Sequence, residues 1–141
     1  MSESDSYHRK ALNPSGVVSP SEPFSQAVVT SGGKTLYIAG QLAVDEQGVT
    51  VGSDIASQAE QVFKNLETVL EGCGGSFSNV VKFTTFLVNA SDVEGFCEKR
   101  RELFAKFFPN GDFPVNTMVV VEQLPKGEWL VEIEAFATLP E

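Results

Sequence analysis

The alternation of apolar and polar positions predicts two strands near the C-terminal end of the sequence. Residues 116–122 are apolar almost without a polar break, and residues 129–136 alternate between apolar and polar side chains. A short apolar run bounded by turn residues is typical of a strand buried on both faces. Residues 124–127 lie between the two runs and contain Pro125 and Gly127, which favour a tight turn, so we expect a hairpin.

The N-terminal half carries the same kind of pattern. Residues 24–30 and 35–39 have strand character, and residues 31–34 between them hold two adjacent glycines. This spacing predicts a second hairpin. A longer apolar run at residues 79–88 predicts a further strand.

Two segments instead show helical spacing. Residues 54–71 place one apolar stripe along a helix that Ser53 or Asp54 can cap. A second helix is expected from Ser91 or Asp92 to about Phe108. Arg100 falls on the apolar side of this second helix, at helical spacing from three aromatic or aliphatic residues, namely Phe96, Leu103 and Phe107.

The predicted order of elements is β-β-α-β-α-β-β, which favours an α+β fold with a single mixed sheet and both helices on one face. No segment remains to cover the other face, although some strands are apolar on both sides, so we expect self-association. Residues 1–12 are expected to form a flexible N-terminal segment, since residues 1–7 are rich in Ser, Asp and Glu. Residues 13–141 are expected to form one domain.

Composition narrows the range of functions. The net charge of −9 argues against nucleic-acid binding, because phosphate recognition needs clustered cations and only residues 99–101 form a short basic run. No stretch approaches the ~20 apolar residues of a membrane span. The polar N-terminus has no signal-peptide core, so we expect a cytoplasmic protein, in which Cys73 and Cys97 are free thiols.

Several chemistries lack their usual residues. His8 is the only histidine and lies in the polar N-terminal segment, so we expect neither a His-dependent triad nor a His-based metal site. No glycine-rich nucleotide loop occurs, and we expect no metal and no cofactor.

What remains is a small polar set on the apolar strands and the second helix: Gly40, Gln41, Arg100, Arg101, Asn116 and Glu132. Each has a plain structural reading as well. Glu132 can be an outward-facing strand carboxylate, Gln41 a polar strand end, and Asn116 a turn residue after a proline. Together they supply one acid and several hydrogen-bond donors, enough to bind a small polar molecule and relay a proton to a water.

Short segments spread over nearly the whole chain resemble the Rid family, also called the YjgF family, of reactive-intermediate deaminases. The resemblance is carried, in order, by PFSQAV at residues 23–28, AGQ at 39–41, Gln58, Asn65 and Leu66, VVK at 80–82, LPK at 124–126 and VEIE at 131–134. It implies a chorismate-mutase-like α+β fold and a homotrimer with three clefts between subunits. It also implies hydrolysis of enamines or imines, such as 2-aminoacrylate, to a keto acid and ammonia.

The family's site residues transfer one by one. By this resemblance Glu132 matches the glutamate that positions the attacking water, and Gly40 and Gln41 match the loop that lines the cleft. Phe24 stands where a tyrosine is common in the family. Met118 is expected to face the cleft mainly through its backbone.

One position departs from the family. Active deaminases carry an arginine that holds the substrate carboxylate, and here Asn116 occupies that place. Asparagine cannot offer the charged fork that suits arginine to carboxylates. The family's asparagine on the second helix has no clear counterpart, since Arg101 or Cys97 falls nearest; Arg100 or Arg101 is the expected substitute cation.

The sequence therefore supports an enamine or imine deaminase whose substrate preference is altered at Asn116, with Glu132 catalytic and Phe24, Gly40, Gln41, Arg101, Asn116 and Met118 binding substrate. The alternative is a non-catalytic trimer on the same scaffold that binds a small ligand or regulates a partner. Family members described as endoribonucleases or translation inhibitors offer a third reading, which the net charge of −9 fits poorly. The expected partners are further copies of the chain and a small molecule.

Overall fold

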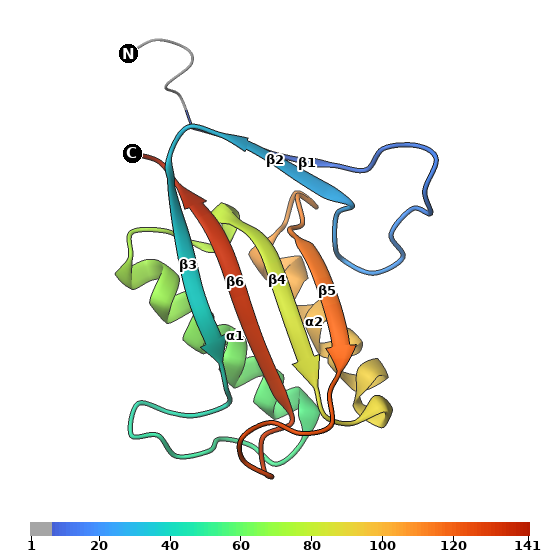
Figure 1. Cartoon of the computed structure of the whole chain (residues 1–141), viewed down its shortest axis with the longest axis vertical. Helices are drawn as coiled ribbons and strands as arrows, with labels where there is room; N and C mark the ends of the chain where they lie inside the picture. The colour runs from blue at the N-terminus through green and yellow to red at the C-terminus, as the bar shows by residue number, and fades with distance from the viewer. Residues whose placement is uncertain (1–6) are drawn as a thin grey trace.

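The computed structural model describes residues 7–141. Figure 1 shows the two long helices on one face of a four-stranded sheet, which confirms the predicted α+β arrangement. The elements in chain order are β1 (His8–Leu12), β2 (Ala27–Ser31), β3 (Lys34–Gln41), α1 (Ile55–Gly72), η2 (Phe77–Asn79), β4 (Val80–Leu87), η3 (Ala90–Asp92), α2 (Val93–Phe107), β5 (Val115–Val120) and β6 (Val131–Leu139).

The four-stranded sheet has the order β3-β6-β4-β5 and is mixed. β6 is antiparallel to both β3 and β4, whereas β4 and β5 are parallel. Parallel neighbours need a crossover connection, and α2 supplies it. The expected hairpin of residues 116–122 with residues 129–136 is therefore wrong, because β4 lies between β5 and β6. Local apolar patterning marks the strands, but their pairing is decided by contacts distant in sequence.

The N-terminal strands form a separate pair, the β1–β2 arm. β2 is antiparallel to β1 in the register His8↔Ser31 through Leu12↔Ala27, so the expected pairing of β2 with β3 is wrong. Positive φ angles at Gly32 and Gly33 turn the chain between β2 and β3 without closing a hairpin. Figure 1 shows the arm leading away from β3 across one end of the sheet.

Residues 8–12 also differ from the expected flexible segment, while residues 1–6 lie outside the described residues. β1 satisfies its backbone groups by pairing with β2, and Arg9 ties it to the body of the domain. Arg9 Nε donates to the Val80 carbonyl over 2.8 Å, and Nη2 donates to the Asp112 carbonyl over 3.1 Å. His8 is thus a strand residue and not part of a tail.

The core fills the space between the sheet and the two helices. Phe63 of α1 lies at its centre, with ring centroids 5.8 Å from Phe83 of β4 and 5.4 Å from Phe104 of α2. α1 begins as the sequence predicts, since the Asp54 carboxylate accepts a hydrogen bond from the Ser57 amide over 2.8 Å. The apolar stripes of both helices therefore pack on the same face of the sheet.

The opposite face of the sheet has no helix over it within residues 7–141. Tyr37 of β3 is 72% exposed there, and Val119 of β5 is 40% exposed. The expectation that residues 116–122 form a strand buried on both faces is wrong for the single chain, because no element within residues 7–141 covers the face on which Val119 lies. No helix in the described part of the chain is long and apolar enough to cross a membrane.

Candidate functional site

Glu132 lies on the uncovered face of the sheet. In the β4–β6 register it stands opposite Phe86, which in turn stands opposite Val119 of β5. Residues paired across neighbouring strands share a face, so all three side chains project away from the helices. Partial burial raises the pKa of the Glu132 carboxyl, and the neighbouring charge of Glu134 raises it further.

Gly40 makes the space that Glu132 occupies. A methyl group added at Gly40 would overlap the Glu132 carboxylate, so only glycine allows this contact. The β3–β6 pairing is irregular here, shifting between Ile38 and Gln41, which places Gln41 opposite Ile133. The structure thus brings Gly40 and Glu132 together from two distant segments, whereas Gln41 shares the helix-side face with Ile133.

Asn116 faces the other way. It stands opposite Phe83, whose ring belongs to the core beneath the helices. The Thr85 hydroxyl donates a hydrogen bond to Asn116 Oδ1 over 3.1 Å. Met118, two residues further along β5, also packs against the core with its side chain. Asn116 and Glu132 therefore lie on opposite faces of one sheet.

A loop segment joins the start of β5 to α2. The Ser25 amide donates to the Pro114 carbonyl over 3.1 Å, and the Phe24 amide donates to the Glu22 carbonyl over 2.8 Å. The Glu22 carboxylate reaches α2, where it forms an ion pair with Arg101. Residues 22–25 therefore place Phe24, Arg101 and Asn116 in one neighbourhood.

The two adjacent arginines of α2 differ sharply. The Arg101 side chain is 49% exposed and pairs with Glu22 Oε1. The Arg100 side chain is 3% exposed, as its predicted place on the apolar side of the helix requires, and burial lowers its pKa. Its Nη2 lies 3.8 Å from the Cys97 sulfur, and burial raises the pKa of that thiol.

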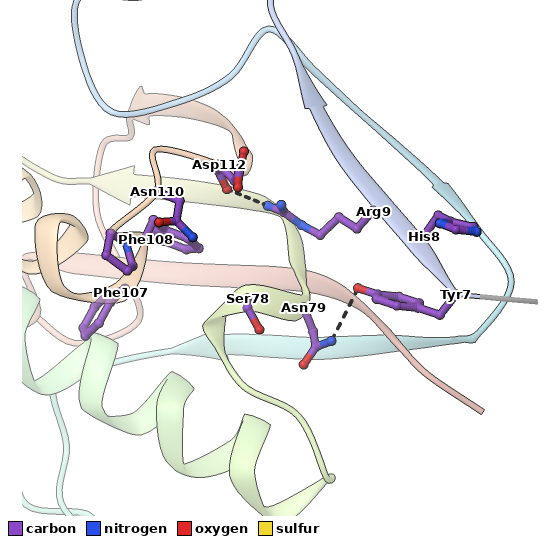
Figure 2. Close-up of a pocket in the computed structure, with 10 residues that line it drawn as sticks. Tyr7, His8, Arg9, Ser78, Asn79, Phe107, Phe108, Asn110 and Asp112 are labelled. Atoms are coloured by element: carbon purple, nitrogen blue, oxygen red, sulfur yellow. Dashed lines mark hydrogen bonds between the residues drawn. The ribbon is translucent and has the colours of Figure 1, made fainter.

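A cavity of about 460 Å³ lies between the β1–β2 arm and the body of the domain. Figure 2 shows the residues that line it. Tyr7, His8 and Arg9 line one side, and residues from the ends of η2 and α2 line the other. None of the site residues predicted from the sequence lines it. A second hollow of about 630 Å³ lies between the loop after β3 and α1, and Gln41 is at its border.

The predicted site residues thus fall into two groups. The open-face group contains Gly40 and Glu132, and the helix-side group contains Phe24, Arg101, Asn116 and Met118. Gln41 belongs to neither group, because it stands opposite the core residue Ile133 and borders the hollow beside α1. A single chain does not bring the two groups into one cleft. Sequence reasoning missed Glu22, although an arginine on the apolar side of a helix calls for a carboxylate partner. Nothing in the irregular stretch around Glu22 indicates which acid that partner is.

The comparisons with known proteins agree with this architecture. The sequence model of the family described as Endoribonuclease L-PSP matches residues 16–139. The chain belongs to the Rid (YjgF) family. It is 38% identical over 119 residues to a RutC family protein of Pyrococcus horikoshii, covering 84% of this chain and 88% of that one. It is 36% identical over 116 residues to the human 2-iminobutanoate/2-iminopropanoate deaminase, covering 82% and 79%.

Solved structures place this Rid protein in the same fold. YyfB of Yersinia pestis, a conserved Rid protein of unknown function, superposes with a TM-score of 0.82 at 37% identity, covering 93% of this chain and 98% of that one. RidA from an Antarctic Psychrobacter gives a TM-score of 0.66 at 36% identity, covering 92% and 94%. The chorismate-mutase-like α+β fold implied by the sequence is confirmed.

Proposed function

We propose that this Rid protein hydrolyses a small enamine or imine to a keto compound and ammonia, with a substrate preference altered by Asn116. Mammalian relatives named 2-iminobutanoate/2-iminopropanoate deaminase are 34–36% identical to the chain over most of its length. The observation that carries the proposal is the placement of Glu132 against Gly40, where partial burial raises the pKa of the carboxyl.

The chemistry follows from that carboxylate. Water bonds through its oxygen to the imine carbon while the Glu132 carboxylate accepts the water's proton, and the proton then passes to the nitrogen. The adduct then carries a hydroxyl and an amino group on one carbon. Glu132 passes the hydroxyl proton to the amino nitrogen, the C–N bond breaks as ammonia leaves, and the oxygen forms the C=O bond of the ketone. A pKa raised toward neutrality makes the carboxylate a stronger base than an exposed glutamate at the same pH.

The two groups of site residues combine only between chains. We propose homotrimers in which the open-face group of one subunit meets the helix-side group of its neighbour. The apolar residues exposed on the uncovered face, Tyr37 and Val119 among them, support a partner there. Phe24, Asn116 and Met118 then border the cleft from the second subunit, beside Arg101.

Replacement of the acid tests the proposed chemistry. Glu132→Gln keeps the shape of the side chain and removes the base, so release of keto acid from 2-iminopropanoate generated in situ is expected to fall about 100-fold or more. Glu67→Gln, a half-buried glutamate of α1 that belongs to neither group of site residues, is the matched control and should behave as wild type. If the wild-type protein releases keto acid no faster than buffer alone, the deaminase proposal is wrong.

Mixing two variants tests the shared cleft. Asn116→Asp places a negative charge where the substrate carboxylate is expected and should also be inactive. If each cleft takes Glu132 from one chain and Asn116 from the next, random trimers of Glu132→Gln and Asn116→Asp chains in equal amounts should contain about a quarter intact clefts. Activity that stays at the level of the separate variants contradicts the shared cleft.

Asn116 itself favours a second candidate, a non-catalytic trimer that binds a small ligand or regulates a partner. The loss of the family's carboxylate-binding arginine fits a site for an uncharged or heterocyclic molecule. Thermal stabilisation by such compounds, without turnover of any imine, would support this candidate over the deaminase. Turnover that depends on Glu132 would exclude it.

A further inference from the structure

Four buried side-chain polar atoms within residues 7–141 have no hydrogen-bond partner, and they belong to only three residues. They are Glu22 Oε2, Ser25 Oγ, and Nε and Nη1 of Arg100. Folded proteins satisfy nearly all such atoms, so each exception calls for a reason. Glu22 and Ser25 lie on one short loop segment, and Glu22 faces Arg100. The exceptions therefore mark one place in the fold.

Arg100 is held in that place by packing. Its guanidinium carbon lies 5.4 Å from the centre of the Phe96 ring, one helical turn earlier in α2. Its Nη2 is 3.9 Å from Glu22 Oε2 and 3.8 Å from the Cys97 sulfur. An oxygen at 3.9 Å is beyond hydrogen-bond range. The side chain is thus a positioned cation whose Nε and Nη1 donate to no group in the described chain.

Glu22 neutralises Arg100 only in part and makes no hydrogen bond to it. Its Oε1 pairs with the half-exposed Arg101, which leaves Oε2 buried near Arg100 without a hydrogen bond. Glu22 belongs to the connection between β1 and β2 and lies in no helix or strand. Its side chain is 28% exposed, whereas that of Arg100 is 3% exposed, so of the two charged groups Glu22 is the one in contact with solvent.

We propose that Arg100 is the carboxylate receptor of this Rid protein and that Glu22 is an internal carboxylate which occupies the receptor until a ligand carboxylate displaces it. The assignment rests on the proposed function, because it supplies the cation that Asn116 lacks. Ser25 is anchored to Pro114, two residues before Asn116, so the receptor adjoins the helix-side group.

Displacement exchanges a poor contact for better ones. A small carboxylate that enters beside Arg100 can accept from Nε or Nη1, the donors that Glu22 leaves unused. The released Glu22 regains water and keeps Arg101 within reach. Because Glu22 competes for the receptor, the apparent affinity for every carboxylate is reduced by the fraction of chains in which the receptor is occupied.

Calorimetric titration with pyruvate, and with uncharged pyruvamide as the matched probe, tests the assignment on the full-length protein. Glu22→Gln removes the competitor and should tighten pyruvate binding. Arg100→Met keeps the length and apolar contacts of the side chain, and should weaken pyruvate binding at least about tenfold. Neither change should alter the response to pyruvamide. Equal pyruvate affinity in wild type and Arg100→Met overturns the assignment, as does absence of pyruvate binding to both wild type and Glu22→Gln.

Arg101→Met separates the two arginines. It is compared in the Glu22→Gln background, where no internal carboxylate competes for either arginine. Pyruvate binding should then be unchanged by Arg101→Met, and weaker binding would move the receptor to Arg101. Arg100→Lys keeps the charge without the planar fork, and should bind pyruvate between wild type and Arg100→Met. Circular dichroism of each variant confirms that affinities refer to folded protein, and Arg100→Lys and Glu22→Gln decide the question if Arg100→Met does not fold.

The outcome is distinguishable from that of the proposed function. Glu132→Gln should lose turnover and keep pyruvate affinity, because Glu132 lies outside the receptor. If the wild-type protein hydrolyses no imine but its pyruvate binding depends on Arg100, the receptor assignment stands and the deaminase proposal is wrong. If wild type and Arg100→Met hydrolyse an imine with the same KM, the deaminase proposal stands and the receptor assignment is wrong.

Discussion

The two faces of the four-stranded sheet are finished in different ways. On the helix side, Phe63, Phe83 and Phe104 interlock in edge-to-face and tilted pairs and exclude water. On the open side, Tyr37 and Phe136 also meet edge to face, with ring centroids 5.3 Å apart, yet Tyr37 is 72% exposed. The same kind of contact therefore serves the chain's own core on one face and remains available to a partner on the other.

Each face also carries one charge that is costly to hold. Glu132 on the open face has a raised pKa, so the folded chain disfavours its ionised form. Arg100 on the helix side is buried beside a carboxylate that it does not reach. Charged groups that a fold holds at a cost in stability often belong to functional sites. These two charged residues lie on opposite sides of the sheet. In the proposed function Glu132 acts as the base, and Arg100 binds the ligand carboxylate.

The largest contrast between the faces is expected in stability. Phe63→Ala opens a cavity at the centre of the core and should lower the free energy of unfolding by about 3–5 kcal/mol. Tyr37→Ala removes an exposed ring and should cost less than about 1 kcal/mol of the chain's own stability. Urea denaturation at a protein concentration too low for trimers to form measures both, because it then reports the single chain. Similar losses in the two variants would show that the open face contributes to the folding of the chain as the core does.

The buried polar side chain of Gln58 contributes to the helix side by joining α1 to the loop segments before α1 and before β6. Its amide donates to the carbonyls of Gly52 and Glu128 over 3.1 and 2.8 Å, and its oxygen accepts from the Leu130 amide over 2.9 Å. Gln58→Leu leaves these backbone groups without a partner and should cost about 2–3 kcal/mol.

The matched control for Gln58 is Gln123→Leu, in the exposed loop before β6, for which a change within about 0.5 kcal/mol is expected. Thermal and urea unfolding of the two variants give the comparison. If Gln58→Leu is as stable as Gln123→Leu, the loops at this end of the sheet are held by other contacts.

Gly40 tests the open face through activity. Gly40→Ala forces the Glu132 carboxylate out of its place, and kcat should fall about tenfold to 100-fold, as expected for a misplaced catalytic group. Gly127→Ala adds the same methyl group where no atom lies within 4 Å and should leave kcat unchanged. Equal kcat values for the two alanine variants would mean that the position of Glu132 does not limit the reaction.

The smallest expected effect is a shift in pH dependence. The negative charge of Glu134 contributes to the raised pKa of Glu132, so Glu134→Gln should lower that pKa. The ionised form of Glu132 then persists to lower pH, and the acid limb of the kcat/KM profile moves to lower pH. Glu67→Gln is the control. A shift of the acid limb toward higher pH, or the same shift in the control, would show that ionisation of Glu132 does not cause this limb.

Local patterns in the sequence predict where the helices and strands lie, but they do not predict which strands pair. Helical spacing indicates α1, its Asp54 cap and the inward side of Arg100, because each depends on residues within a few turns. Strand pairing depends on distant contacts, so both predicted hairpins are wrong although the strands exist. The turn at Gly32 and Gly33 fits a hairpin equally well, and only β1 decides where β2 pairs.

The candidate site shows the same limit. Resemblance to the Rid family singles out Glu132, Gly40 and Asn116, but only the sheet register shows that Asn116 and Glu132 lie on opposite faces. Glu22 cannot be found from the sequence, because a partner for a buried arginine can come from any of the many acidic residues in the chain. Its role emerges from atoms left without hydrogen bonds, and that feature exists only in three dimensions.

The central place of β6 has a consequence for how the protein is made. β3 and β4 do not touch in the sheet, and each pairs with β6, which is the last of the strands to leave the ribosome. The sheet therefore cannot close during synthesis of residues 34–130, and β3 emerges early with its future partner still untranslated. Domains generally fold as units, so productive folding of this one begins after residue 139 is clear of the exit tunnel. Until then, the nascent chain presents unpaired strand edges that chaperones would recognise.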